Sequence, residues 1–204
     1  MILYSSTASP FGRKIKLAAH VLGLIDEIDV RPTDTMNSAD EIRTINPLGK
    51  IPSLVTGGVT LYDSRVIMEY LDSRAGGGRI IPTAGMDRYR CLTAAAKMDG
   101  IIDAALLMVY EGRFRLPEMH VDKFVDWQRD KIIRALQSID PTPYKGNTMP
   151  DVADIGLACA LDYLDFRKLM SWRDYAPTLA EWKVGFAAVV AGYAETMPVD
   201  PREQ

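Results

Sequence analysis

The feature that most constrains this chain is where its short extended runs occur. Residues typical of strands recur over 2–4, 28–31, 53–56 and 59–62, and after Arg74 the apolar spacing is helical. Four short strands are enough for one small sheet, whereas the later residues can bury their apolar side chains only by packing helix on helix. The sequence therefore predicts an α/β unit followed by an all-helical one.

Helices are predicted between the strands of the first part. A helix over 10–22 begins with Pro10 behind the capping residue Ser9 and ends at Gly23. A shorter helix over 40–45 precedes the last two strands, which flank Gly57-Gly58 and are therefore predicted to form a hairpin, and a further helix follows them. The first part therefore has the order strand, helix, strand, helix, strand, strand, helix.

A linker separates the two parts. Three consecutive glycines, 76–78, are followed by Pro82, and both residue types interrupt regular structure. We therefore place one domain at 1–77 and a second, all-helical domain at 83–204. The helices expected in the second domain cover 86–115, 124–139, 150–168 and 177–193.

The helix over 150–168 has two distinctive features. Its first turn carries an acidic cap, Asp151, with a second acid, Asp154, three residues later, which is close to a capping box. Its apolar residues extend most of the way around the helix. We expect it to be the buried centre of the helical domain.

Composition excludes several classes of function. Of 204 residues, 24 are Lys or Arg and 27 Asp or Glu, with a net charge of −3 and no basic block, so nucleic acid is not an expected partner. No apolar run is long enough to cross a membrane, and 1–4 lacks a basic leader, which predicts a cytoplasmic protein. Cys91 and Cys159 lie far apart in apolar stretches, as suits a reducing compartment. With only His20 and His120, no metal site is expected.

Ile51-Pro52 precedes the third strand. Proline cannot donate to a strand ladder, so it suits a strand entrance, where its peptide bond is either trans or cis. If the bond is cis, the amide and carbonyl of Ile51 turn outward. They could then pair with an extended peptide ligand as an added strand would.

Asp63-Ser64 begins the helix after the fourth strand, and two interpretations are open. Either side chain can cap the helix by accepting a hydrogen bond from an early backbone amide. The free amides and the positive end of the helix dipole can also hold an anion, while Asp63 holds an ammonium group. Together they would fit the head of a zwitterionic amino acid.

Ser9 also has two interpretations. Ser9-Pro10 is typical of a helix cap followed by a first-turn proline. A hydroxyl at a helix N-terminus can alternatively donate to a ligand thiolate, whose negative charge the helix dipole stabilises. Lowering a thiol pKa from ~8.5 to ~6.5 requires roughly 2.7 kcal/mol and raises the thiolate fraction at pH 7 from ~3% to ~75%.

Four motifs occur in a fixed order along the chain. They are Ser9-Pro10-Phe11-Gly12-Arg13-Lys14, Asn46-Pro47-Leu48-Gly49-Lys50-Ile51-Pro52, Leu61-Tyr62-Asp63-Ser64 and Asp151-Val152-Ala153-Asp154. In this order and spacing they resemble the cytosolic glutathione transferases over nearly the whole chain. Two further segments, at 99–104 and 163–167, are most similar to a bacterial group of glutathione transferase-like proteins. The resemblance implies a thioredoxin-like first domain, a helical second domain, glutathione as co-substrate and a homodimer.

The resemblance gives Ser9 a role. Its position matches the thiolate-stabilising serine of the serine-type classes, and equally the cysteine of the omega-like and thioredoxin-like relatives. Serine in place of cysteine disfavours mixed-disulfide chemistry. By the same resemblance, Asp151 caps the central helix and has a folding role.

The remaining site residues follow from the same resemblance. Ile51 before Pro52 is expected to pair with the cysteinyl backbone of glutathione, Asp63 and Ser64 to hold its γ-glutamyl head, and Lys50 to reach a carboxylate. The candidates for the electrophile pocket are Phe11, Gly12, Met108, Glu111 and Arg115. Other aromatic and Met side chains are packing residues by default, although some could line an apolar pocket: Tyr110, Phe114, Phe166 and Trp172.

The sequence thus favours a glutathione transferase in which the Ser9 hydroxyl stabilises the thiolate that attacks a hydrophobic electrophile, in the manner of a detoxification enzyme. Two alternatives remain open. One is a binding or interaction module of the same fold without catalysis, because function resides in the site rather than in the fold. The other is a glutathione-dependent peroxidase or ether-cleaving enzyme, which would direct the same thiolate at another electrophile.

Overall fold

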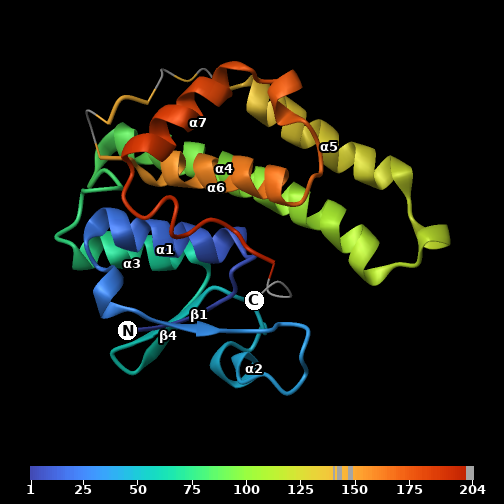
Figure 1. Cartoon of the computed structure of the whole chain (residues 1–204). Coiled ribbons are helices and arrows are strands. Elements are labelled where there is room, and N and C mark those ends of the chain that lie inside the picture. The colour runs from blue at the N-terminus through green and yellow to red at the C-terminus, as the bar shows by residue number, and fades with distance from the viewer. Residues whose placement is uncertain (140, 142–143, 147–148, 201–204) are drawn as a thin grey trace.

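The first part of the chain forms one four-stranded sheet (Figure 1). The structure is a computed structural model that describes residues 1–139, 141, 144–146 and 149–200. The strands are β1 (Ile2–Ser5), β2 (Asp29–Pro32), β3 (Ser53–Thr56) and β4 (Val59–Leu61), in the spatial order β2-β1-β3-β4. β1 is parallel to β2 and antiparallel to β3, and β3 and β4 form the predicted hairpin. All four predicted strands are confirmed.

Helices cover the two faces of this sheet. α1 (Pro10–Leu22) and α3 (Ser64–Arg74) lie side by side on the face toward the rest of the molecule, and α2 (Ile42–Ile45) lies on the other side (Figure 1). The cap of α1 is as predicted, because the Ser9 side chain accepts a hydrogen bond from Gly12 N and Gly23, at φ +72°, ends the helix. This sheet with its three helices is the thioredoxin-like unit that the sequence predicts.

The rest of the described chain is helical. Four long helices, α4 (Gly85–Phe114), α5 (Asp122–Gln137), α6 (Val152–Phe166) and α7 (Thr178–Val189), are joined by loops that contain short 3-10 turns. The predicted fold class is therefore confirmed. The domain limits 1–77 and 83–204 stay predictions, and residues 201–204 lie outside the described part. Among the described residues, no helix has both the length and the apolarity needed to cross a membrane.

α6 is the buried centre of the helical part, as predicted. From Ile155 to Leu164 every residue of the helix is buried. Its capping box is complete, because Asp151 Oδ1 accepts from Ala153 N at 2.8 Å and from Asp154 N at 2.9 Å, while Asp154 Oδ2 accepts from Asp151 N at 3.1 Å. Burial and the neighbouring Asp151 raise the pKa of Asp154 to about 6.

The last helix is shorter than predicted. α7 ends at Val189 instead of continuing to residue 193, because the chain turns back at Gly192, which has φ +78°. A side chain at Gly192 would collide with the His20 ring of α1, since a Cβ there would lie 2.2 Å from His20 Cγ. The turn directs the segment 193–199 along α1, where Val199 O accepts from Thr7 Oγ1 at 2.9 Å.

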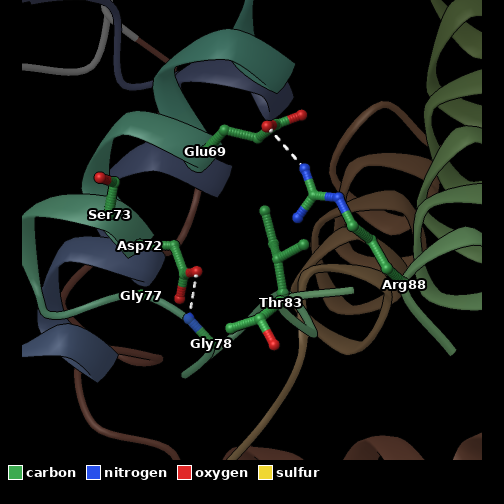
Figure 2. Close-up of a pocket in the computed structure, with 8 residues that line it drawn as sticks. Glu69, Asp72, Ser73, Gly77, Gly78, Thr83 and Arg88 are labelled. Atoms are coloured by element: carbon green, nitrogen blue, oxygen red, sulfur yellow. Dashed lines mark hydrogen bonds and ion pairs between the residues drawn. The ribbon is translucent and has the colours of Figure 1, made fainter. Parts of the chain in front are cut away.

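Asp72 fixes the linker between the two parts. Its carboxylate accepts hydrogen bonds from the amides of Gly78 (2.9 Å), Arg79 (2.9 Å) and Ile80 (2.8 Å). A cavity of about 200 Å³ lies beside it, bordered by the Glu69–Arg88 ion pair (Figure 2). None of the predicted site residues lines this cavity, so it belongs to the junction of the two parts.

Hydrogen bonds at the linker also set the direction of α6. Val152 N donates to Ile80 O at 3.0 Å, and the adjacent Arg79 Nη1 donates to Leu22 O at 3.3 Å. α6 therefore begins where α1 ends. Farther along both helices, Arg13 of α1 pairs with Asp162 of α6, which shows that the two helices run antiparallel.

The Arg13–Asp162 ion pair is buried, with both side chains 1% exposed and Nη1 2.5 Å from Oδ2. The Asp162 carboxylate also accepts from Tyr193 OH at 3.0 Å and pairs with Lys183. Arg13 donates further to Tyr193 O at 3.3 Å and to Thr196 Oγ1 at 3.4 Å. Every charge in this cluster is thus compensated, as burial requires.

Breaking this pair is expected to be costly. Asp162→Ala should lower the free energy of unfolding by about 3–5 kcal/mol, because the Arg13 guanidinium would stay buried without its carboxylate. Asp130→Ala, which removes the exposed partner of Arg134, should cost less than about 1 kcal/mol. Urea denaturation measures both values, and equal losses for the two variants would contradict this assignment.

Candidate functional site

The register of the sheet brings three of the predicted segments to one edge. β1 pairs with β3 through Tyr4↔Ser53, so the loop that leaves β1 and the loop that enters β3 share an edge. β3 pairs with β4 through Leu54↔Leu61, and the same register places Asp63 next to Pro52. The candidates of the sheet part therefore lie together, although they are up to 55 residues apart in sequence.

At this edge, Ser9 both caps α1 and keeps a free hydrogen. Its Oγ accepts from Gly12 N at 3.1 Å, which uses a lone pair and leaves the O–H to donate. That O–H donates no hydrogen bond to any of the described residues. The two interpretations of Ser9 are compatible, because one hydroxyl can accept from the helix and donate to a ligand.

Two neighbouring hydroxyls, those of Ser5 and Thr7, differ from that of Ser9 in the use of their hydrogens. Ser5 is buried and its Oγ donates to Ser6 O at 3.4 Å, and Thr7 Oγ1 donates to Val199 O at 2.9 Å. Both hydroxyl hydrogens are therefore already used within the chain. Ser9 is also half-buried and stands at the positive end of a 13-residue helix, where negative charge is stabilised.

The entrance to β3 presents unpaired backbone groups. The Ile51–Pro52 bond is cis. Neither the amide nor the carbonyl of Ile51 is hydrogen-bonded to any described residue, whereas Lys50 O accepts from both Asn46 Nδ2 (3.0 Å) and Ser53 Oγ (2.9 Å). The buried Asn46 thus holds the turn, and Ile51 remains available for an added strand. Asn46 belongs to the motif over 46–52, but the sequence pattern alone does not indicate this role.

Asp63 and Ser64 stand at the beginning of α3 and keep polar atoms that can bind a ligand. Asp63 caps α3 by accepting from Arg65 N at 2.9 Å, and its exposed carboxylate keeps a second oxygen for another donor. The Ser64 hydroxyl has no hydrogen-bond partner among the described residues. Lys50 is exposed and forms no ion pair within the described part of the chain, so it also can meet a ligand carboxylate.

Two acids of α4 complete the charge pattern here. Asp99 is buried and pairs with Lys14 of α1 and with Arg65 of α3, whose Nε lies 2.9 Å from Asp99 Oδ2. One turn later is Asp103, whose pKa is raised by desolvation and by Asp99 and is lowered in part by Arg65 and Lys50. In the sequence, both acids contribute only to the resemblance of the segment 99–104 to the bacterial group. Their place beside Lys14 and Arg65 depends on contacts between helices.

The candidates for the electrophile pocket separate into two groups. Phe11 and Gly12 lie in the first turn of α1, next to Ser9, and Lys14 Nζ lies 5.6 Å from the centre of the Phe11 ring. Met108 and Glu111 are buried side chains of α4. Glu111 Oε1 accepts from Val121 N at 2.8 Å and from Nη1 of the exposed Arg115 at 3.1 Å. Glu111 and Arg115 therefore fix the connection from α4 to α5.

The match to a known family decides the identity of this fold. The model of the glutathione S-transferase N-terminal domain matches residues 3–79. The uncharacterized GST-like protein YibF of Escherichia coli K12 is 33% identical over 174 residues, which cover 83% of this chain and 84% of that protein. The chain belongs to the glutathione S-transferase family. The matched segment 3–79 contains Ser9, Ile51-Pro52 and Asp63-Ser64.

Solved structures of the family agree over the full chain. A glutathione transferase family member from Pseudomonas fluorescens Pf-5 with bound glutathione is 38% identical, with a TM-score of 0.86 over 98% of this chain and 99% of that one. The Pf-5 family member with bound S-(propanoic acid)-glutathione is 39% identical, with a TM-score of 0.85 over 98% and 100% of the two chains. A glutathione S-transferase from Methylobacillus flagellatus KT with glutathione bound is 32% identical, with a TM-score of 0.87 over 97% and 99%.

The close approach of β1 to α1 gives a prediction about Gly12. A Cβ at Gly12 would lie 2.0 Å from Ser5 Oγ, so Gly12→Ala should lower the free energy of unfolding by about 1–3 kcal/mol. Gly100→Ala is the control, because nothing lies within 4 Å of a Cβ there. Gly12→Ala should cost less in a Ser5→Ala background, as measured by urea denaturation. A cost that is unchanged in that background would contradict the contact.

Proposed function

We propose that this chain is a glutathione transferase that activates the glutathione thiol through Ser9. The observation that carries the proposal is the Ser9 hydroxyl, which stands at the N-terminus of α1 with its hydrogen free to donate. The glutathione bound in the family structures supports glutathione as the ligand of this chain as well.

The edge of the sheet offers a place for each part of the tripeptide. The free amide and carbonyl of Ile51, held in place by Pro52, would pair with the cysteinyl backbone as an added strand does. Asp63 would hold the γ-glutamyl ammonium, and the Ser64 hydroxyl with the first amides of α3 would hold its carboxylate. Lys50 would meet the glycyl carboxylate. This arrangement directs the thiol toward Ser9.

The chemistry requires no general base. A hydrogen bond from Ser9 and the dipole of α1 together stabilise a thiolate by about 1–3 kcal/mol, which is enough to ionise much of the bound thiol at pH 7. The thiolate then forms a carbon–sulfur bond with the electrophile, and the leaving group departs with its electron pair. Phe11 and Gly12 border the thiolate position and line the beginning of the electrophile pocket, to which Met108, Glu111 and Arg115 contribute through the shape of the α4–α5 connection.

The division of roles between two residues gives the test. Ser9→Ala should lower kcat with 1-chloro-2,4-dinitrobenzene at least about tenfold and change the Kd for glutathione by less than about threefold, because only the thiolate contact is lost. Asp63→Asn should have the opposite pattern, with a weaker affinity for glutathione and a nearly unchanged kcat. Its amide oxygen still caps α3, but the lost charge should weaken glutathione binding about tenfold or more.

Steady-state kinetics and calorimetry separate these outcomes. Ser6→Ala is the matched control, since it removes a nearby hydroxyl that does not cap α1. Full turnover in Ser9→Ala would contradict the assignment of Ser9. A native protein that binds glutathione without turnover on any electrophile would favour the non-catalytic binding module, and turnover only on peroxides or ethers would favour the other alternative.

We further propose that the protein acts in the cytoplasm as a homodimer and removes hydrophobic electrophiles. Exposed apolar side chains on α3 and on the first turns of α4 support the dimer, since such surfaces commonly mark an interface: Val66, Met86 and Tyr89. Sedimentation equilibrium should give twice the mass of the single chain, and Val66→Asp should shift it toward the monomer. A native protein that sediments as a monomer at micromolar concentration would contradict the dimer.

A further inference from the structure

Arg113 and Arg167, at the ends of α4 and α6, have no carboxylate partner among the described residues. Most of the described arginines pair with Asp or Glu, but no carboxylate among the described residues lies within ion-pair distance of Arg113 or Arg167. Arg113 belongs to the last turn of α4, and Arg167 follows the last residue of α6. Within the described part of the chain, no carboxylate therefore compensates these two positive charges.

Aromatic rings hold both guanidinium groups. The Arg167 guanidinium lies 4.6 Å from the centre of the Phe166 ring and 5.6 Å from that of Tyr163, and Arg113 lies 5.4 Å from that of Tyr110. The Arg167 Nε is buried with no acceptor. Stacking on these rings thus fixes the plane of this side chain.

The charges of Arg113 and Arg167 both act on the hydroxyl of Tyr163. The pKa of the Tyr163 hydroxyl is raised by burial, and both Arg167 and Arg113 oppose that rise. Tyr163 and Arg167 lie at the end of α6 and Tyr110 and Arg113 at the end of α4, so each guanidinium group lies on an aromatic ring where one of these helices ends. The two helices run in the same direction, since Cys91 Sγ lies 3.6 Å from Asp151 Oδ2 at their beginnings and, farther along both, a Cβ at Gly156 would lie 2.9 Å from Met98 Cβ.

This cluster lies at the same end of the molecule as Ser9. α1 and α6 are antiparallel, with Arg13 paired to Asp162, so the beginning of α1 lies at the end of α6. Ser9 is one turn before Arg13, and Phe166 is one turn after Asp162. The Lys14–Asp99 pair positions α4 alongside them, and the last turns of α4 extend beyond the beginning of α1 (Figure 1). An electrophile attacked by a thiolate at Ser9 would thus extend toward the cluster.

We propose that Arg113 and Arg167, with the rings of Tyr110, Tyr163 and Phe166, form a subsite for the carboxylate of an anionic electrophile. This inference rests on the proposed function and narrows its substrate class. Guanidinium groups hold carboxylates through short, charge-assisted hydrogen bonds, and the surrounding rings supply apolar contact for the carbon skeleton. The substrate is then a molecule that carries an electrophilic carbon at one end and a carboxylate at the other.

The reaction at such a substrate is a substitution by the thiolate. With an aryl chloride that carries a carboxylate, the glutathione sulfur forms a bond to the chlorine-bearing carbon. The carbon–chlorine bond then breaks, and chloride leaves with the bonding electrons. The thiol proton has already passed to solvent. The carboxylate stays on the arginines and does not take part in the bond changes.

Binding of two conjugates of equal size tests the subsite without relying on catalysis. The probes are S-(2-carboxyethyl)glutathione and its neutral amide, S-(2-carbamoylethyl)glutathione. The native protein should bind the acid at least about tenfold more tightly than the amide, because only the acid presents a charge to the arginines. Arg113→Gln and Arg167→Gln should each reduce this ratio, and the double variant should bring it close to one.

Control measurements keep the outcomes distinct. Arg90→Gln removes the same charge from the first part of α4, about 34 Å from Arg113 along the helix, and should leave the ratio unchanged. Glutathione itself should bind equally well to all variants, which also shows that they are folded. In the double variant, turnover of the 4-chloro-3,5-dinitrobenzoate anion should likewise fall more than turnover of its methyl ester.

Equal affinity for acid and amide in the native protein, or a ratio that survives the double substitution, would overturn the subsite while leaving the proposed function intact. Failure of the native protein to bind glutathione at all would instead overturn the proposed function, and the subsite with it.

Discussion

The buried pair of Arg13 and Asp162 is the interaction on which the rest of the structure depends. It joins the first turns of α1 to the last turns of α6, and the pair also holds the segment after α7 through Tyr193 and Thr196. Such a pair tolerates burial only because each charged group has further partners. It therefore acts as a positional constraint: α1 can pack on the helical part in one register only. That register places the beginning of α1, where Ser9 stands, at the end of α6.

A second constraint comes from the sheet. Because β3 is antiparallel to both β1 and β4, the loops that carry Ser9, Ile51 and Asp63 meet at one edge. Each of these residues has a local structural role that leaves a polar group unused: a hydroxyl hydrogen, a backbone amide with its carbonyl, and a carboxylate oxygen. The same residues at this edge thus stabilise the fold and keep polar groups available for a ligand.

Much of this was accessible from the sequence because the signals are local. The Ser9-Pro10 cap, the Gly57-Gly58 hairpin and the Asp151 capping box each depend on residues within one turn of each other, and the structure has all three. Contacts between distant segments were not accessible. Nothing in the spacing of Lys14 and Asp99 indicates that they pair, and Asp103 acquires its altered pKa only from that packing. Glu111 is a polar residue whose partner, Val121 N, lies ten residues away in a loop.

The end of α7 also depends on a contact between distant segments that the sequence does not reveal. Its apolar pattern continues to residue 193, but the helix stops at Val189 because the chain must turn at Gly192 to pack on His20. Periodicity reports which face of a helix is apolar, whereas the length of the helix depends on what that face meets. The placement of Arg113 and Arg167 on aromatic rings, away from the carboxylates of the described residues, likewise depends on contacts that exist only in the folded chain.

The central claim is that the Ser9 hydroxyl stabilises a thiolate at the beginning of α1. The most direct measurement is the ultraviolet absorbance of the thiolate of bound glutathione as a function of pH, in the native protein and in Ser9→Ala. The account predicts a bound thiol that ionises about two pH units below the ~8.5 of a free thiol, and a return toward that value in the variant. A bound thiol that ionises at the same pH in both proteins would contradict it.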